Sequence, residues 1–219
     1  RGILPLESFH LSHSLARTLR QERFAHSHDL AFDAVIRCCA ARAEGRPESW
    51  INHSILDAYV RLHAEGHAHS VETWDQTGRL VGGLYGVRIG GAFFGESMFS
   101  RATDASKAAL AHLVARLRCG GFRLLDTQFL TAHLATFGGI EVKRGRYLEL
   151  LREAITAEAD WHALEQELGP DQLAAPAPAV VFDAAATLGD LVEASVPLPL
   201  ASRFGPSGKR IVQLLSHTS

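Results

Sequence analysis

Hydrophobic residues recur every three or four positions in several stretches of the chain, which is the spacing of helices that bury one face. In the longest stretch, apolar residues follow Leu110 at positions i+3, i+4 and i+7. Asp104 precedes this stretch as the expected N-cap, and Gly120 and Gly121 follow it as the expected end. The same spacing predicts further helices over residues 14–24, 31–42, 52–66, 131–137 and 147–155.

Alternating apolar and polar residues predict β-strands between these helices, over residues 67–74, 80–89, 92–99 and 122–129. Three glycines in the second of these strands (Gly82, Gly83 and Gly86) indicate a bulge, or a place where another backbone or a ligand comes close. A meander of strands followed by a helix, a strand and further helices is typical of an α/β fold with a mixed sheet.

The composition changes at about residue 156, after which Ala, Pro and Leu dominate and residues 174–180 predict a linker. We therefore expect a domain over residues 1–155 and a C-terminal Ala/Pro-rich appendage over residues 156–219. The sequence begins with Arg1 and not with Met, so we expect the native protein to begin earlier.

Length and composition are those of a globular protein, with 219 residues of which 47% are hydrophobic and 21% are charged. Because the formal net charge is only -2, any contact with nucleic acid must depend on a local basic patch. The candidate patch is the basic face of the helix predicted over residues 14–24, formed by Arg17, Arg20 and Arg23. The alternative is that this face is simply a solvated charged surface.

The three cysteines, two of which are adjacent, form neither a disulfide framework nor the spacing of a zinc site. This favours a reducing compartment, and we expect the protein in the cytoplasm. No run approaches the roughly 18 apolar residues of a membrane span, so we expect no membrane partner.

Two strand-like apolar stretches carry the candidate chemistry, FFGESMFSR with Glu96 and LLDTQF with Asp126 and Gln128. Burying an unpaired carboxylate is costly, so Glu96 needs a partner, a raised pKa or an open cleft. The alternative is an edge strand with Glu96 in water. Asp126 and Gln128 are two residues apart and therefore share one face of their strand. This set suits a site that holds a cationic or amine-bearing substrate and guides an acyl transfer.

Other common chemistries lack their sequence signatures. No G-x-S-x-G motif surrounds Ser97, and the phosphate-binding P-loop and the dinucleotide fingerprint are absent. His67 and His69 share a strand face with Glu72 nearby, which makes zinc conceivable. Because no further ligand follows at a suitable spacing, we expect no metal.

Seven stretches, in order and without large gaps from about residue 1 to residue 151, resemble the leucyl/phenylalanyl-tRNA–protein transferases. They are WIN, LDAYVRLHAEGHAHSVETW, LVGGLYG, FFGESMFSR, DASKAALAHLV, GGFRLLDTQF and HLATFGGIEVKRGRY. The resemblance implies a GNAT-like acyltransferase domain that moves Leu or Phe from aminoacyl-tRNA to the N-terminal Arg or Lys of an acceptor protein. It implies that the acceptor is thereby marked for N-end rule degradation. It also implies no cofactor, because the aminoacyl ester is already activated, and we expect a monomer.

The resemblance assigns roles to individual residues. Asp126 would brace Gln128, Gln128 would orient the attacking α-amine, and Glu96 would pair with the cationic end of the acceptor. The transferred side chain would enter an apolar pocket, and the aminoacyl-adenosine end of the tRNA would contact two aromatic residues. The pocket positions are Leu84, Phe93, Leu113 and Leu117, the aromatic positions are Trp50 and Tyr59, and Ser97 is a further substrate-binding candidate. From their spacing alone, Trp50 and Tyr59 are equally compatible with plain core packing.

Two departures and two alternatives accompany this interpretation. Family members begin with a further small domain that the sequence does not include, and leucine stands at pocket positions where bulkier residues are common. One alternative is an acetyl-CoA-dependent GNAT N-acetyltransferase, which binds pyrophosphate through a Gly-rich loop. The turn over residues 101–104 lacks glycine and contains Asp104, which would repel phosphate. The other alternative is a non-catalytic tRNA-binding module.

Overall fold

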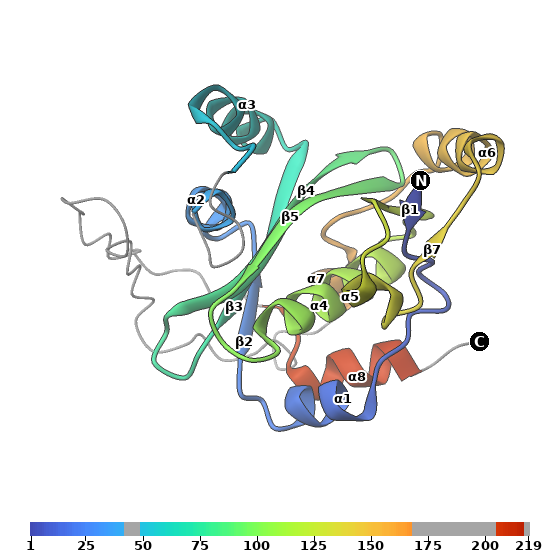
Figure 1. Cartoon of the computed structure of the whole chain (residues 1–219). Coiled ribbons are helices and arrows are strands. Elements are labelled where there is room, and N and C mark those ends of the chain that lie inside the picture. The colour runs from blue at the N-terminus through green and yellow to red at the C-terminus, as the bar shows by residue number, and fades with distance from the viewer. Residues whose placement is uncertain (42–48, 168–204, 217–219) are drawn as a thin grey trace.

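The computed structural model describes residues 1–41, 49–167 and 205–216, which form an α/β fold (Figure 1). Within these residues a seven-stranded sheet has the order β2-β3-β4-β5-β6-β1-β7. The strands are β1 (Gly2–Ile3), β2 (Ala25–His28), β3 (Ala68–Trp74), β4 (Leu80–Ile89), β5 (Ala92–Ser100), β6 (Leu124–Gln128) and β7 (Ile140–Glu141). The helices are α1 (His13–Arg20), α2 (Phe32–Ala40), α3 (His53–Ala64), α4 (Ala105–Cys119), α5 (Ala132–Ala135), α6 (Arg144–Ile155), α7 (Ala163–Glu167) and α8 (Gly208–Ser216).

The sheet is mixed, as the sequence predicts. Strands β2 to β5 form an antiparallel meander, and α4 connects β5 to β6, which pairs with β5 in parallel. Strands β1 and β7 extend the sheet beyond β6 in antiparallel pairing. All four predicted strands and all six predicted helices are present, and each observed bound lies within four residues of the expected one.

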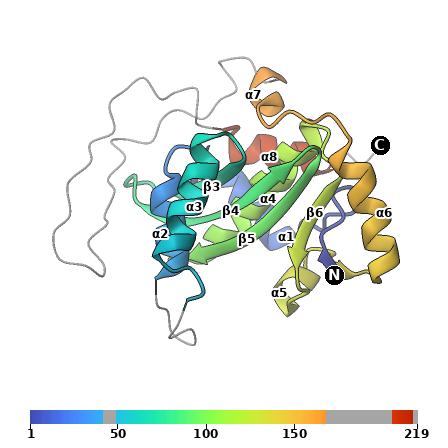
Figure 2. The same ribbon diagram turned by 90° about the horizontal axis from the view of Figure 1, so that it is seen from above.

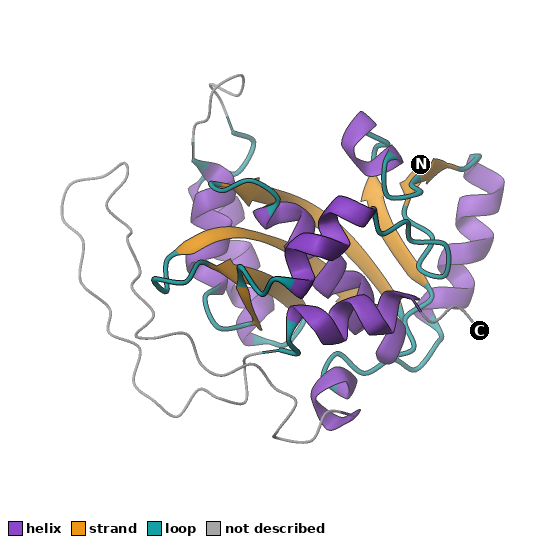
Figure 3. Ribbon diagram, turned by 90° about the horizontal axis from the view of Figure 1, so that it is seen from below, coloured by secondary structure: helices purple, strands orange, loops and turns teal. Residues whose placement is uncertain are grey.

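Helices cover both faces of the sheet. Helices α2 and α3 pack on one face through a cluster that includes Phe32, Ile36 and Tyr85 (Figure 2). Helix α6 packs on the same face near β5 and β6, through Tyr147 and Leu151. Helices α4, α1 and α8 lie on the other face over the largest hydrophobic cluster. Figure 3 shows from below that helices cover this face of the sheet.

Helix α4 packs directly against the backbone of β4 at Gly82. A Cβ atom on Gly82 would come within 2.7 Å of the Cβ of Ala105, so any larger residue would push the helix away. Asp104 directly precedes α4, as predicted, but the prediction that its side chain caps the helix is wrong. The residue has a left-handed backbone (φ 67°), no capping bond forms, and its carboxylate accepts from Lys107 Nζ at 2.8 Å instead.

The described parts of residues 156–219 pack into the same core as the rest of the chain. Trp161 is fully buried and stacks on Phe93 (centroids 5.5 Å apart) and on His69 (4.3 Å). Its indole nitrogen donates to Asp29 Oδ2 at 2.8 Å. Helix α8 buries Ile211 and its apolar neighbours against α1 and α4. The linker predicted over residues 174–180 lies outside the described residues.

Two further sequence observations can be compared with the structure. All three cysteines are free. Among the described residues, no helix is both long enough and apolar enough to span a bilayer.

Candidate active site

Glu96 is the extra residue of a β-bulge. Across the β4–β5 pair, Gly86 lies opposite Gly95 and Tyr85 lies opposite Ser97, so Glu96 has no partner residue. A Cβ on Gly86 would collide with the carbonyl oxygen of Phe94, which explains why glycine stands there. The glycines of β4 thus indicate the bulge, although the inserted residue belongs to β5. A bulge re-aims a side chain and is frequent beside active sites.

Gln128 bridges β5 and β6 at the point where they stop pairing. Their parallel ladder runs from Ala92, opposite Leu124, to Phe94, opposite Asp126, and goes no further. Beyond it the Gln128 side-chain amide donates to Glu96 Oε2 at 2.9 Å and to the Gly95 carbonyl at 3.3 Å. The structure therefore brings together Glu96 and Gln128 from two strands, as expected. Among the described residues, no group donates to Gln128 Oε1.

The backbone of Gln128 is held in an unusual conformation. Its φ of 64° is positive, and the amide of Phe129 donates to the carbonyl of Thr127 at 2.7 Å, which closes a three-residue turn. Such turns are rare, and residues held in sparsely populated conformations cost about 1–3 kcal/mol and concentrate at functional sites. Asp126 stabilises the turn, because its Oδ1 accepts from the backbone amide of Gln128 at 2.6 Å. Asp126 thus braces the main chain of Gln128 and not its side-chain amide.

Asp126 is itself fully buried, and two residues that the sequence analysis missed partner its carboxylate. Arg1 Nε donates to Oδ1 at 3.0 Å and to Oδ2 at 2.9 Å, and the Tyr147 hydroxyl also donates to Oδ2. Burial, reinforced by this hydrogen bond and the charge of Asp126, raises the pKa of Tyr147 to about 12. The cost of an unpaired buried carboxylate, which the sequence analysis applied only to Glu96, would also have predicted partners for Asp126. Sequence spacing could not name them, because Arg1 is 125 residues away from Asp126.

Glu96 lies on the other side of Gln128 and is half-buried. Burial raises the pKa of its carboxyl group, whereas hydrogen bonds from Gln128 and Tyr59 oppose that rise. Tyr59 comes from α3, and burial together with the nearby Glu96 raises its pKa to about 12. Trp50 packs edge-on against Tyr59 at 6.5 Å and is 52% exposed. Tyrosines from α3 and α6 thus reach the site from opposite sides.

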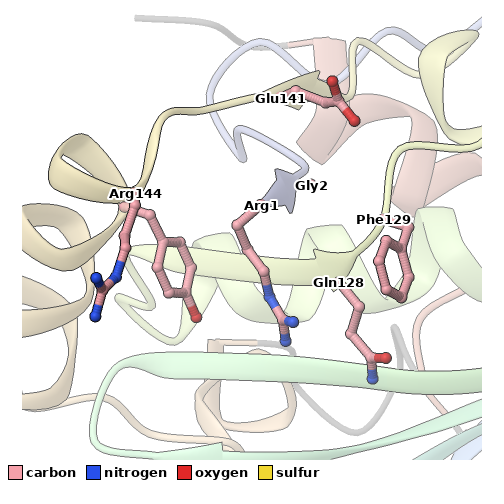
Figure 4. Close-up of a pocket in the computed structure, with 7 residues that line it drawn as sticks. Arg1, Gly2, Gln128, Phe129, Glu141 and Arg144 are labelled. Carbon is pink, nitrogen blue, oxygen red and sulfur yellow. The ribbon is translucent and has the colours of Figure 1, made fainter.

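A cavity of about 340 Å³ opens beside Gln128 on the α6 side of the site (Figure 4). Figure 4 shows Gln128 and Arg1 pointing in the same direction, with Glu141, Arg144 and Phe129 around them. The lining residues are Arg1, Gly2, Gln128, Phe129, Glu141, Arg144 and Tyr147.

Comparison with known proteins identifies the family. The family model for leucyl/phenylalanyl-tRNA protein transferase matches residues 3–152. The chain belongs to this family. A leucyl/phenylalanyl-tRNA–protein transferase of Rhizorhabdus wittichii is 52% identical over 221 aligned residues, which cover 100% of this chain and 86% of that protein. The enzyme of the same name from Paramagnetospirillum magneticum is 60% identical over 74% of this chain and 76% of that protein. That of Zymomonas mobilis is 47% identical over 100% of this chain and 86% of that protein.

Two of these alignments to transferases extend over the whole chain, including the C-terminal stretch that the resemblance recognised from the motifs did not cover. The burial of Trp161 and α8 in the shared core gives a physical reason for this. The described residues of the C-terminal stretch, 156–167 and 205–216, therefore contribute to the core of the domain.

The four predicted pocket residues lie together, but in closed core. They belong to the cluster under α4, on the sheet face opposite α3, and their exposed fractions are 0–3%. Tyr85, the neighbour of Leu84 in β4, instead faces α3 and contacts Tyr59. Ser97 is half-buried opposite Tyr85. A transferred side chain could therefore enter among the four residues only if they moved apart. These four are Leu84, Phe93, Leu113 and Leu117.

The predicted basic patch is exposed at the C-terminal end of α1. Arg17 and Arg20 lie on the helix, which ends at Arg20 and not at residue 24. Arg23 follows in the next turn, and its guanidinium group lies 5.9 Å from the Phe24 ring centroid. All three side chains are exposed.

One cluster among the described residues has the geometry of a metal site, but an arginine occupies it. His28, His162 and Glu165 place their ligand atoms within 4.8 Å of one another. Arg116 donates to both carboxylate oxygens of Glu165 and, at 3.0 Å, to His28 Nδ1. A metal ion would have to displace this guanidinium group.

The other conceivable zinc cluster is not assembled. His69 bonds Asp29 at 2.8 Å, Glu72 accepts from two serine hydroxyls, and His67 is exposed. Each of the first two groups therefore already has a protein partner.

Proposed function

We propose that this chain transfers Leu or Phe from aminoacyl-tRNA to the N-terminal Arg or Lys of acceptor proteins. The observation that carries the proposal beyond family membership is the Gln128 amide. Its nitrogen is fixed by Glu96 and Gly95, so its oxygen is presented to a substrate donor. A neutral α-amine is such a donor, and fixing it in an attack geometry is a large part of catalysis.

In the proposed reaction the α-amine nitrogen forms a bond to the aminoacyl carbonyl carbon. The bond from that carbon to the ribose oxygen of the tRNA breaks, and the ribose oxygen ends with the proton that the amine loses. Gln128 Oε1 accepts a hydrogen bond from the attacking amine and aims its lone pair. No metal or nucleotide enters this scheme, because the ester already carries the activation.

Glu96 supplies the negative charge that a cationic N-terminal side chain requires in a partly desolvated cleft. It lies within hydrogen-bonding distance of Gln128, so the amine and the side chain of one acceptor residue can meet the two groups together. The aminoacyl-adenosine end of the tRNA then binds on the α3 side, against Trp50 and Tyr59. We further propose that the enzyme acts in N-end rule degradation, in the cytoplasm and as a monomer.

The finer fold assignment is also a proposal, namely that the domain is GNAT-like. The mixed sheet and the parallel β5–β6 pair that separates at the site support it. The conformation at the start of α4 argues against an acetyltransferase that uses acetyl-CoA as the donor. Asp104 holds a left-handed backbone there and directs its carboxylate to Lys107, where a pyrophosphate would need free backbone amides.

A single experiment separates the three candidate functions. The protein is incubated with an Arg-starting peptide and with Leu-tRNA, Phe-tRNA or acetyl-CoA, and both the mass of the peptide and the binding of tRNA are measured. We expect a gain of one Leu or Phe residue and no acetylation. Acetylated peptide would establish the acetyltransferase, and tRNA binding without any transfer would establish a binding module.

A further inference from the structure

The cavity on the α6 side of Gln128 has a position that the transfer reaction leaves unassigned. Trp50 and Tyr59 lie on the α3 side of Glu96, whereas the cavity extends from Gln128 toward β1, β7 and α6. An acceptor whose α-amine meets Gln128 must continue away from the donor half of the site. The cavity borders Gln128 on that side.

The walls of the cavity carry unused binding groups. Phe129 is 75% exposed although it is aromatic. Glu141 and Arg144 are both exposed and carry opposite charges, and no described residue forms an ion pair with either. Arg1 commits its Nε to Asp126, and its guanidinium group also lies beside the Tyr147 side chain, 5.9 Å from the ring centroid. Such groups match a short peptide segment, with main-chain carbonyls for the guanidinium group and a side chain for the aromatic ring.

The charges of the cavity argue for a peptide and against an RNA phosphate. Arg1 is neutralised by Asp126 through two hydrogen bonds to its carboxylate. Glu141 on the opposite wall offsets Arg144. A phosphate site gathers net positive charge, which this cavity lacks. Its volume of about 340 Å³ is at the lower end of the range for ligand pockets.

We propose that this cavity binds the second and third residues of the acceptor polypeptide. Phe129 contacts the side chain of the second residue, Glu141 and Arg144 select its charge, and the terminal guanidinium nitrogens of Arg1 bind the main chain. The enzyme would therefore rank acceptors by their second residue as well as by their first. This inference rests on the proposed transfer function.

The test measures kcat/KM for peptides that begin with Arg followed by Gly, Leu, Asp or Lys. Phe129→Ala should lower the use of the Leu peptide by about fivefold relative to the Gly peptide, since an aromatic contact of this kind contributes modestly. Glu141→Gln should lower use of the Lys peptide relative to the Asp peptide by about threefold, and Arg144→Gln should shift that ratio the opposite way by a similar factor. The KM for aminoacyl-tRNA should stay unchanged in all three.

Matched controls use exposed residues outside the cavity, namely Ile155→Ala, Glu153→Gln and Arg152→Gln. They should leave every peptide ratio unchanged. Wild-type protein that transfers to Arg-starting peptides, with variants that leave the ratios unchanged, would overturn the subsite and leave the transfer function standing. A raised KM for aminoacyl-tRNA in the cavity variants would assign the cavity to RNA. Absence of transfer to any of the peptides by the wild type would overturn the transfer function, and the subsite with it.

Discussion

Gln128 concentrates three unusual features in one residue, namely a positive φ, a backbone amide fixed by Asp126 and a side-chain amide fixed by Glu96. The stability of the fold gains nothing from a positive φ at a glutamine. Glycine adopts that conformation freely, so its absence here indicates that the side chain is needed.

The first prediction follows from this conflict between stability and function. Gln128→Gly should leave the free energy of unfolding equal or higher, because the backbone strain is relieved, while single-turnover transfer falls about 100-fold or more. Gln128→Ala should lose the same activity without the gain in stability. Both are checked by urea unfolding and by rapid-quench transfer with saturating tRNA. If folded Gln128→Ala retained near-normal transfer, the residue would be structural.

At Glu96, too, a functional group is placed where it does not favour the stability of the fold, in this case because its charge is partly buried. Burial raises the pKa of its carboxyl group, so ionising it destabilises the folded protein progressively as the pH rises. The substrate must then supply the compensating cation. Sequence reasoning found this residue from its acidity within an apolar run, but its position in a bulge depends on register with β4, which no local pattern reports.

The second prediction concerns acceptor choice and its pH dependence. Glu96→Gln keeps the shape and removes the charge, so preference for Arg-starting over Ala-starting peptides should fall about 30-fold or more. In the wild type that preference should increase as the pH rises through the elevated pKa of Glu96, whereas the variant should show a flat profile. Competition between the two peptides at several pH values measures both. A variant that keeps the wild-type preference would show that Glu96 does not bind the cation.

At the scale of elements, the sequence predicted the longer strands, which have a periodic pattern of their own. It missed short strands that form only by pairing with a neighbouring strand. The strands of five residues or more were anticipated, because each alternates over a length that a pattern can register. Strands β1 and β7 have two residues each and exist only because β6 and one another pair with them. Arg1 reaches Asp126 through that pairing. The partner of the candidate catalytic carboxylate therefore could not be predicted from local pattern.

Helix α1 gives the third prediction. The basic face of Arg17, Arg20 and Arg23 is exposed, so replacing all three with Ala should reduce the slope of log affinity for tRNA against log salt by up to about 0.7–0.9 per lost phosphate contact. Arg79, Arg123 and Arg152 are exposed as well and provide the matched control triple. Fluorescence titration at several salt concentrations gives the slopes. Equal slopes for the two triple variants would remove α1 from the tRNA interface.

At the scale of the whole molecule, composition indicated a boundary near residue 156, yet the described residues beyond it are part of the core. Low-complexity composition reports the average character of a segment and does not register single anchors. Trp161 is such an anchor, because it fills the space between His69, Phe93 and Phe122 and packs under the Arg116 guanidinium group.

Trp161 therefore gives the last prediction. Removing a fully buried tryptophan typically costs about 3–5 kcal/mol, so Trp161→Ala should lower the free energy of unfolding by that amount, and Trp161→Phe by less because stacking on Phe93 can persist. Trp50→Ala is the matched control, because Trp50 is 52% exposed and should change stability little. Urea titration followed by circular dichroism measures all three. Because Phe93 lies in β5, three residues before Glu96, Trp161→Ala should also reduce transfer by loosening that strand. Equal stabilities of Trp161→Ala and Trp50→Ala would show that the stretch after residue 156 is an appendage after all.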